Sequence, residues 1–303
     1  MKNFFTLSRK KSIAGMLFVL PFTIGFLYFI VFGIITSVQM SMSDISFGAS
    51  GLQLEWNRFE NFINTFTVHP TFNEVLTTSI MNILIDVPLI IFFSLFIALF
   101  LNQTFRGRTL ARAIFFFPVI LGAPAISSAL TMAQAMMLGG VAPASAAVME
   151  SSGSDVMVNV SYYLYMLGNL AIPPTIIEYI IGAVGRINNI IISSGVQIVI
   201  FLAALQTISP TVYEAAKIEG ATPYETFWLI TFPMVSPLIL TNVVYTIIDS
   251  FSSSPVVTLS YNTVFFDFNY GLGTVFALVS SIAIGIVLAT IVFVLNRSTY
   301  YYT

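Results

Sequence analysis

The segment Glu214–Pro237 reads EAAKIEGATPYETFWLITFPMVSP and separates two strongly apolar stretches of the chain with polar and acidic residues. Just before it, Ser209 and Pro210 stand in the order preferred at the start of a helix, an N-cap hydroxyl followed by proline at the first helical position. Gly220 is suited to end that helix, because glycine readily adopts the left-handed conformation common after a helix C-terminus. A short helix is therefore predicted between these signals.

A second helix is predicted to begin immediately afterwards. Thr222 stands as its N-cap, a proline takes the first position, and Glu225 follows three residues after the cap, as in a capping box. Ala215 and Ala216 leave one side of the first helix without bulk, so another protein surface can approach its backbone closely. Residues 209–236 thus have the properties of a compact docking loop.

Six positions of this loop match, in identity and spacing, the EAA signature of binding-protein-dependent ABC importer permeases: Glu214, Ala215, Ala216, Gly220, Ile230 and Pro233. The usual Ile-x-Leu-Pro ending has phenylalanine in place of leucine here, which is a conservative departure. In that family the loop is the cytoplasmic coupling helix, which inserts into a groove of the ATPase subunit. The alternative is an ordinary amphipathic helix at the membrane surface. The resemblance implies an ATPase-coupling role for Tyr213, Glu214, Ala215, Ala216, Lys217, Gly220, Ile230 and Pro233.

The composition is that of an integral membrane protein. Hydrophobic residues make up 57% of the chain and charged residues only 8%, against about 25% charged residues in a typical soluble domain. Cysteine is absent and His69 is the single histidine, so we expect neither thiol catalysis nor a metal site. The formal net charge of −2, with a basic cluster only in the N-terminal tail, argues against nucleic-acid binding.

Six apolar segments are each near or above the ~20 residues that a helix needs to cross a hydrocarbon layer ~30 Å thick. They lie at Ile13–Val38, Leu76–Leu101, Ala113–Leu138, Ile187–Ile208, Leu238–Pro255 and Leu272–Leu295. The first follows a basic tail and resembles a secretory signal, but its apolar run is too long and no cleavage site follows, so we expect a retained anchor. The predicted fold is an all-α integral membrane protein with six transmembrane helices.

Lysine and arginine are distributed unevenly over the predicted loops. Nine of the eleven fall on one side of the six spans: Lys2, Arg9, Lys10, Lys11, Arg106, Arg108, Arg112, Lys217 and Arg297. Only Arg58 and Arg186 fall on the other side. Because basic loops stay in the cytoplasm, both termini and the 209–236 loop are predicted to be cytoplasmic.

The predicted organisation divides the chain as follows: a cytoplasmic tail at 1–12, a first anchor helix at 13–38, an extracytoplasmic loop at 39–75, a permease core at 76–297 and a cytoplasmic tail at 298–303. The 39–75 loop carries aromatic residues among acidic ones, so we expect it to be partly ordered near the lipid headgroups. Within the core, 139–186 is expected to be an extracytoplasmic insertion, a helical hairpin at the membrane surface. The alternative is that 162–181 forms a seventh span, which would move the 209–236 loop outside.

Polar side chains recur at helical spacing inside three predicted spans, where such residues tend to face a cavity or another helix. The stripes are Asn189, Ser193 and Gln197 in the fourth span, Asn242, Tyr245, Asp249 and Ser252 in the fifth, and Asn82 with Asp86 in the second. We interpret the first two stripes as a translocation pathway, because hydroxyls and amides supply the donors and acceptors that a polyhydroxylated solute needs. The alternative is hydrogen bonding between helices, which we favour for the stripe in the second span.

The opening helix and the region 76–297 resemble sugar-importer permeases of the maltose-transporter type. In that family the helices before and after the coupling loop line the substrate cavity. The resemblance implies a bacterial or archaeal cell membrane and a complex with a second permease, two ATPase subunits that bind ATP and Mg, an extracellular solute-binding protein and a sugar. It places five residues at cavity-facing positions: Asn189, Ser193, Tyr245, Asp249 and Ser252.

The chain itself has no Gly-x4-Gly-Lys-Ser/Thr phosphate loop, so we expect it to hold no cofactor and to leave ATP hydrolysis to its partners. Three other function classes are compatible with parts of the sequence. An ABC permease for a non-sugar solute would share the coupling loop. A secondary transporter could use Asp86 and Asp249 as an ion relay, but it has no use for an alanine-flanked cytoplasmic loop. A membrane-embedded enzyme would need a catalytic constellation that the sequence lacks.

Overall fold

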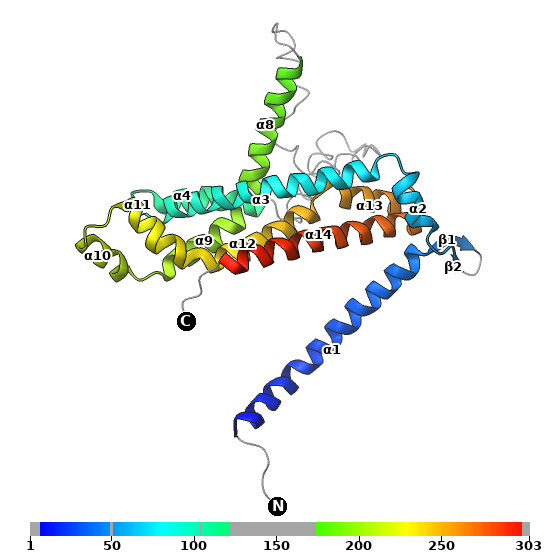
Figure 1. Cartoon of the computed structure of the whole chain (residues 1–303), viewed down its shortest axis with the longest axis horizontal. Coiled ribbons are helices and arrows are strands. Elements are labelled where there is room, and N and C mark those ends of the chain that lie inside the picture. The colour runs from blue at the N-terminus through cyan, green and yellow to red at the C-terminus, as the bar shows by residue number, and fades with distance from the viewer. Residues whose placement is uncertain (1–6, 49–50, 104, 122–173, 299–303) are drawn as a thin grey trace, which may run out of the picture. The chain divides into compact units, whose positions relative to one another are not determined.

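The computed structural model of the chain describes residues 7–48, 51–103, 105–121 and 174–298 (Figure 1). Most of these residues are helical, and two short strands occur among them. The chain divides into two compact units, residues 1–74 with 259–282 and residues 75–258 with 283–303. Each unit is described by itself.

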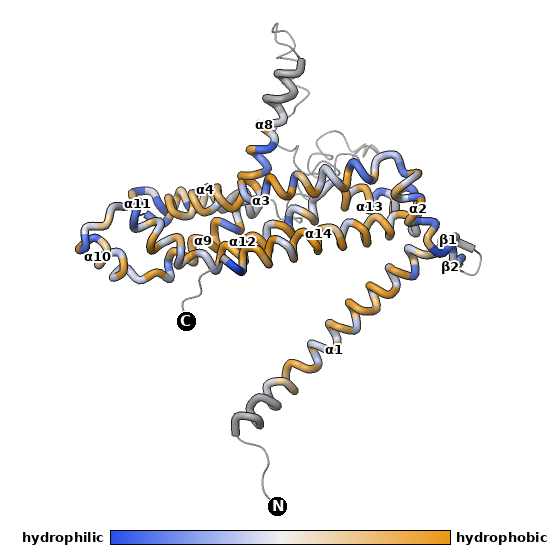
Figure 2. The backbone as a smooth tube through the Cα atoms, viewed as in Figure 1, coloured by the Kyte–Doolittle hydropathy of each residue, from blue (hydrophilic) through white to orange (hydrophobic). Residues whose placement is uncertain are grey.

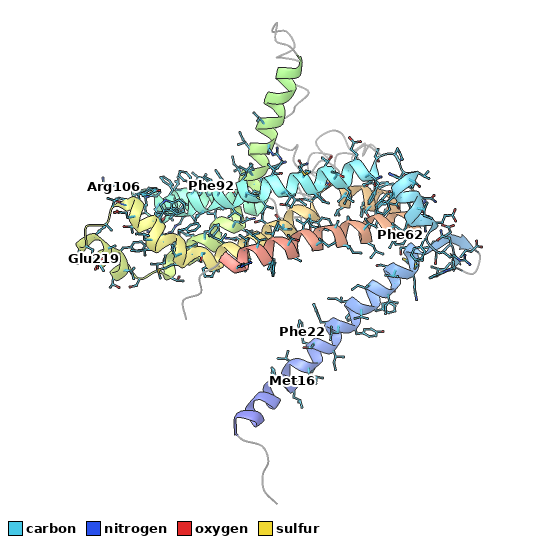
Figure 3. The ribbon with its side chains drawn as sticks, viewed as in Figure 1. Met16, Phe22, Phe62, Phe92, Arg106 and Glu219 are labelled. Carbon is cyan, nitrogen blue, oxygen red and sulfur yellow. The ribbon has the colours of Figure 1, made fainter. Side chains whose placement is uncertain are left out.

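The first unit begins with the long helix α1, Leu7–Ser41. It is apolar along most of its length (Figure 2), and side chains such as Met16 and Phe22 (Figure 3) are each 74% exposed. The stretch Gly15–Ser41 is long and apolar enough to cross a membrane. A helix that is apolar on every side and makes few contacts within its own unit is suited to lipid or to a partner helix.

An antiparallel hairpin and a short helix follow α1. Strand β1, Ser43–Gly48, pairs with β2, Gly51–Trp56, and helix α2 spans Glu60–Thr67. The prediction of partial order in the 39–75 loop is confirmed, but the hairpin was not predicted. The alternating apolar residues of SDISFG and GLQLEW were a signal for it.

The rest of the first unit comes from the ends of three further helices: α3, Phe72–Asn102; α13, Pro255–Phe265; and α14, Tyr270–Ser298. Phe72 stacks on Phe276 with ring centroids 4.4 Å apart. His69 meets the edge of the same ring, and its Nδ1 accepts the backbone N–H of Phe72 at 3.1 Å. The single histidine therefore satisfies a donor at the start of α3.

The second unit contains most of α3 and the helices that follow it. These are α4, Arg108–Leu121; α8, Pro174–Ser193; α9, Gly195–Thr207; α10, Pro210–Ile218; α11, Pro223–Thr226; the π-helical turn η1, Phe227–Thr231; and α12, Phe232–Ser252. One buried cluster joins α3 to α9 and the first turn of α12, through residues such as Leu101, Phe201 and Val235. A second joins α3, α12 and α14 through Val87, Ile247 and Ile284.

Four helices among the described residues are long and apolar enough to cross a membrane, or five if the bent pair α8 and α9 counts as one span. The first, second and sixth predicted spans correspond to α1, α3 and α14. The third is described only as far as Leu121, so the predicted number of six spans and the alternative of a seventh at 162–181 both depend on residues outside the described ones. What the structure does support is a helical chain with several apolar spans.

The fifth predicted span begins six residues earlier than expected. Helix α12 starts at Phe232 and includes Pro237, although proline in a helix interior removes a backbone donor. Pro237 cannot donate to the carbonyl of Pro233, and the Ser236 hydroxyl donates to that carbonyl instead, at 2.8 Å. This substitute bond lets the helix continue through both prolines.

The fourth predicted span is two helices, α8 and α9, bent by 48°. Ser194 and Gly195 stand at the bend, and the Ser194 hydroxyl donates to the carbonyl of Ile191 at 2.8 Å. Ser and Gly pairs are a common cause of helix kinks. Helix α8 also begins at Pro174, so it runs without a break across the boundary predicted between the 139–186 insertion and the fourth span.

Candidate functional site

The loop between α9 and α12 is a short helix closed by a regular C-terminal motif. Gly220 has φ +83°, and its N–H donates to the carbonyl of Lys217 at 3.1 Å. The N–H of Ala221 donates to the carbonyl of Ala216 at 2.9 Å, which completes a Schellman motif. The prediction that Gly220 ends α10 in a left-handed conformation is confirmed.

The start of α10 differs from the prediction in one detail. Ser209 is the N-cap and Pro210 the first helical residue, as expected, but no side chain caps the backbone. The Ser209 hydroxyl instead lies 2.8 Å from the hydroxyl of Thr211. Ser209 therefore occupies the predicted N-cap position, but its hydroxyl does not cap the backbone.

The second helix of the loop has both halves of its predicted capping box. The N–H of Glu225 donates to Thr222 Oγ1 at 3.3 Å, and the N–H of Thr222 donates to Glu225 Oε2 at 2.7 Å. After one turn the helix widens into η1, where the Thr231 hydroxyl donates to the carbonyl of Thr226, five residues back, at 3.3 Å. Such π turns are frequent at functional sites.

The inner face of α10 fixes the loop to the rest of the second unit. Ala216 is 5% exposed, and Tyr213 packs against the cluster formed by α3 and α9. The Tyr213 hydroxyl also lies 3.3 Å from the hydroxyl of Thr231, which is itself buried. Of the two alanines expected on an open, small-residue surface, Ala215 is exposed and Ala216 is nearly buried, although both line the groove beside α10.

The outer face of α10 carries Glu214, Ala215 and Ile218. Ile218 lies four residues after Glu214 and three after Ala215, so it is a neighbour of both on the helix surface. Ile218 is 88% exposed, the highest value among the large hydrophobic side chains of this loop. Ile218 was not among the predicted coupling residues, although its spacing from Glu214 and Ala215 was a signal for it. Lys217 is exposed as well.

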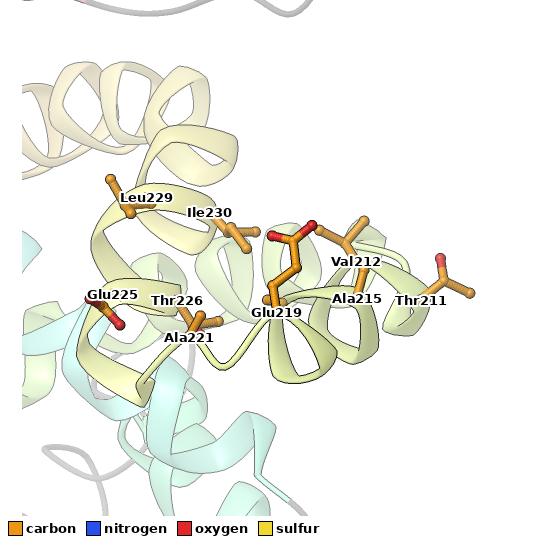
Figure 4. A pocket seen from close by; sticks show the side chains of 10 residues that line it. Thr211, Val212, Ala215, Glu219, Ala221, Glu225, Thr226, Leu229 and Ile230 are labelled. Atoms are coloured by element: carbon orange, nitrogen blue, oxygen red, sulfur yellow. The ribbon is translucent and has the colours of Figure 1, made fainter.

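A groove of about 520 Å³ lies between α10 and the segment formed by α11 and η1 (Figure 4). Val212, Leu229 and Ile230 supply apolar walls, and Glu219 and Glu225 supply two carboxylates. The predicted residue Ile230 is thus part of the site. Pro233 does not line the groove and instead forms the first turn of α12.

The polar residues predicted to form one stripe in the fifth span lie on two different faces of helix α12. Tyr245, Asp249 and Ser252 are exposed, whereas Asn242 is fully buried. Gln197 of α9 is also buried, and its Nε2 donates to Thr246 Oγ1 at 2.9 Å. The prediction that Asn242 and Gln197 line a pathway is corrected accordingly, because both amides are buried within this chain.

The two predicted pathway residues in the fourth span, Asn189 and Ser193, lie in α8, before the bend. Asn189 is exposed and Ser193 is half-buried, whereas Gln197, on the other side of the bend, is fully buried. Ser194 is buried, and its carbonyl accepts the hydroxyl of Ser94 from α3 at 3.3 Å. The predicted stripe requires one straight helix, but the three residues lie on two helices bent by 48° and differ in exposure.

An ion pair joins α3 to α8 through Asp86 Oδ1 and Arg186 Nε, 2.7 Å apart. The side chains are 29% and 40% exposed, respectively. The structural reading of Asp86 is supported, although its partner is Arg186 and not the exposed Asn82. Arg186 is predicted as the last residue of the 139–186 insertion, outside the fourth span, whereas it lies within α8. The two partners are one hundred residues apart, so no local pattern indicated the pair.

Removing one partner of this pair is expected to destabilise the second unit by about 1–2 kcal/mol, between the values typical of exposed and buried pairs. Asp86→Asn and Arg186→Gln remove the charges and keep polar side chains of similar size. Thermal unfolding of the two single variants and the double variant in detergent measures the coupling. We expect the double variant to lose less stability than the two single losses combined. Strictly additive losses would show that the two side chains are not energetically coupled.

The chain was compared with known proteins, and no protein-family model matches it. It is 30% identical over 246 residues to the probable ABC transporter permease protein YesP of Bacillus subtilis, covering 80% of this chain and 72% of the relative. It is 26% identical over 236 residues to the lactose transport system permease protein LacF of Rhizobium radiobacter, covering 78% and 72%. It is 24% identical over 252 residues to the trehalose/maltose transport system permease protein MalF of Thermococcus litoralis, covering 80% and 75%.

A solved structure has a similar fold. It is the crystal structure of a bacterial ABC transporter involved in the import of the acidic polysaccharide alginate, with a TM-score of 0.60 and 18% identity over 96% of this chain and 98% of that one. At this identity the likeness concerns the fold alone. The match to YesP, by contrast, extends over most of both sequences. Together with its apolar helices, it shows that this multi-pass membrane protein belongs to the ABC transporter permease family.

Proposed function

We propose that this chain is a permease subunit of an ATP-driven sugar importer and that residues 209–236 couple it to an ATPase subunit. The observation that carries the proposal is the construction of the loop. Its inner face is fixed to the second unit by Ala216 and Tyr213, while Glu214, Ala215 and Ile218 point outward. A loop held in this way passes a displacement of its outer face on to α12, because Tyr213 contacts η1 directly before that helix begins.

The groove beside α10 indicates what the partner surface offers. Its lining includes the carboxylates of Glu219 and Glu225 and no basic residue. An ATPase surface with an apolar side chain and a lysine or arginine would complement it. ATP and Mg would be bound by that partner, since this sequence contains no phosphate loop of its own.

The transport cycle follows from two states of the complex. Closure of two ATPase subunits on ATP would bring the coupling loops of this chain and a second permease together and open the cavity toward the solute-binding protein. Release of ADP would reverse the movement. Each state is favoured by the ligand that binds it better, as population shift requires.

Sugar is the proposed substrate because the named relatives include permeases of lactose and of trehalose/maltose transport systems. Tyr245, Asp249 and Ser252 form an exposed polar face in the 21-residue helix α12. Such side chains are costly against lipid, so a water-filled cavity or a partner subunit is the better environment for them. We extend the same role to Asn189 and Ser193 of α8.

The proposed orientation places both termini and the coupling loop in the cytoplasm and the hairpin outside. The chain has no cysteine, so one introduced thiol reports one position. Glu55→Cys in β2 is expected to react with a membrane-impermeant maleimide on intact cells, whereas Gln103→Cys after α3 and Tyr224→Cys in α11 should react only after permeabilisation. Labelling of Tyr224→Cys from outside, with Gln103→Cys protected, would instead support the seventh span at 162–181.

Reconstitution tests the proposed function as a whole. The chain would be purified with its partner subunits, placed in vesicles with ATP on the ATPase side, and offered labelled mono- and oligosaccharides and amino acids with the binding protein. We expect ATP-dependent uptake of a sugar. ATP-dependent uptake of an amino acid alone would favour a non-sugar importer, and uptake driven by a sodium or proton gradient without ATP would favour a secondary transporter.

A further inference from the structure

Helix α2 has the reverse of the polarity expected for a helix on a soluble surface. Its polar residues Asn61 and Thr65 are buried, with 4% and 0% of their side chains exposed. Its apolar residues Ile63 and Phe66, and Phe59 just before it, are 59%, 47% and 60% exposed. The outer face of α2, defined as Phe59, Ile63 and Phe66, therefore consists of large apolar side chains.

The buried polar residues fix this orientation. Asn61 Nδ2 donates to the carbonyl oxygens of Ser41 and Ser43, at 3.2 and 3.1 Å. Ser41 is the last residue of α1, and carbonyls at a helix C-terminus lack partners within the helix. The Thr65 hydroxyl donates to the carbonyl of Asn61 at 2.7 Å. Rotating α2 to hide its apolar face would break these bonds, so the face stays outward.

The position of α2 within its unit is near the ends of three apolar helices. It contacts the end of α1 at Ser41 and lies shortly before the start of α3 at Phe72. It also contacts the start of α14, where a Cβ at Gly271 would come within 2.7 Å of Asn61 Nδ2. All three helices are candidate membrane spans. A short helix held where spans begin and end lies at the level of a membrane boundary.

We infer that the outer face of α2, together with the exposed ring of Trp56, inserts into the headgroup and acyl boundary of the bilayer and anchors the first unit there. Aromatic side chains are favoured at this depth because they combine an apolar ring with tolerance of nearby water. Trp56 is 63% exposed, and the neighbouring charged residues Arg58 and Glu60 are exposed as well, which suits contact with headgroups. The inference holds whatever solute the protein carries.

Fluorescence quenching by brominated phosphatidylcholine tests this placement, because the chain has only two tryptophans. In Trp228→Phe, the remaining emission reports on Trp56. In a Trp56→Phe, Trp228→Phe background, Ile63→Trp reports on the outer face of α2, and Glu55→Trp is the matched control, since adjacent strand residues point to opposite sides. The full chain in phosphatidylcholine vesicles is the sample for each variant.

We expect the emission of Trp56 and of Ile63→Trp to be quenched strongly by lipid brominated near the headgroup and less by lipid brominated near the chain ends. The emission of Glu55→Trp should be quenched little by either lipid. Unquenched, red-shifted emission from Ile63→Trp would overturn the inference. Equal quenching at positions 55 and 63 would overturn the orientation of the face. A binding protein or second permease that abolishes the quenching at position 63 would show that a protein covers the face in the complex, which also contradicts the inference.

Discussion

Gly220→Val is expected to remove most ATP-driven uptake while the amount of inserted protein stays nearly unchanged. Gly220 has φ +83°, a conformation that costs a β-branched residue about 1–3 kcal/mol. A Cβ at this position would meet no atom within 4 Å, so the effect comes from the backbone and not from a clash. Relief of the strain requires α10 to move relative to α11, which displaces Glu214 and Ile218. Uptake and stimulated ATP hydrolysis, measured in the same vesicles, should fall together.

Two control variants separate coupling from general strain. Gly220→Asn should keep most of the uptake, because asparagine tolerates the left-handed conformation better than other residues. Gly107→Val introduces the same strain elsewhere, since Gly107 has φ +95° and open space around its Cβ position. We expect it to affect uptake much less. Full uptake by Gly220→Val would contradict the coupling role of the loop.

Asp249→Ala and Tyr245→Ala are expected to lower sugar uptake by about a hundredfold or more, because sites that hydrogen-bond a solute discriminate strongly when a partner is lost. Both side chains lie on the exposed face of α12, one turn apart. The complex should still assemble and hydrolyse ATP, since neither residue belongs to the clusters that hold α12 to α3, α9 and α14. Uptake per assembled complex is the quantity to measure.

Ile248→Ala is the matched control, because Ile248 is exposed on the same helix and has no polar group to offer a solute. It should leave uptake close to the unchanged level. If the face around Asp249 served only to join subunits, the yield of complex would fall in Asp249→Ala, and uptake per complex would remain normal. That result would refute the pathway and leave the coupling loop untouched.

The local structure of the coupling loop was predictable because short-range signals determine it. Thr222 and Glu225 cap α11 through atoms three residues apart, and Gly220 closes α10 through its own backbone. The long apolar segments that form α1, α3 and α14 were likewise predictable from composition alone. Signals of this kind need no knowledge of the tertiary fold.

Features that depend on distant partners were not predictable from one sequence. Helical spacing predicts Gln197 as part of a pathway, but the residue is buried and its Nε2 donates to Thr246 of α12. The Arg186 pair with Asp86 and the inward packing of Ala216 have the same origin, since each depends on a helix far away in sequence or on the exact rotation of a short one. Helical periodicity predicts which residues share a face of a helix, but tertiary packing determines whether that face contacts another helix, lipid or water.

Site-directed photo-cross-linking at position 218 tests the coupling role most directly. Ile218 is 88% exposed on the outer face of α10, and Ala216, two residues earlier, is 5% exposed and serves as the internal control. With the assembled complex in vesicles, a photoreactive residue at 218 is predicted to form an adduct with the ATPase subunit, and one at 216 is predicted to form little or none. An absence of ATPase adducts at 218 in a complex that transports would contradict the proposed coupling.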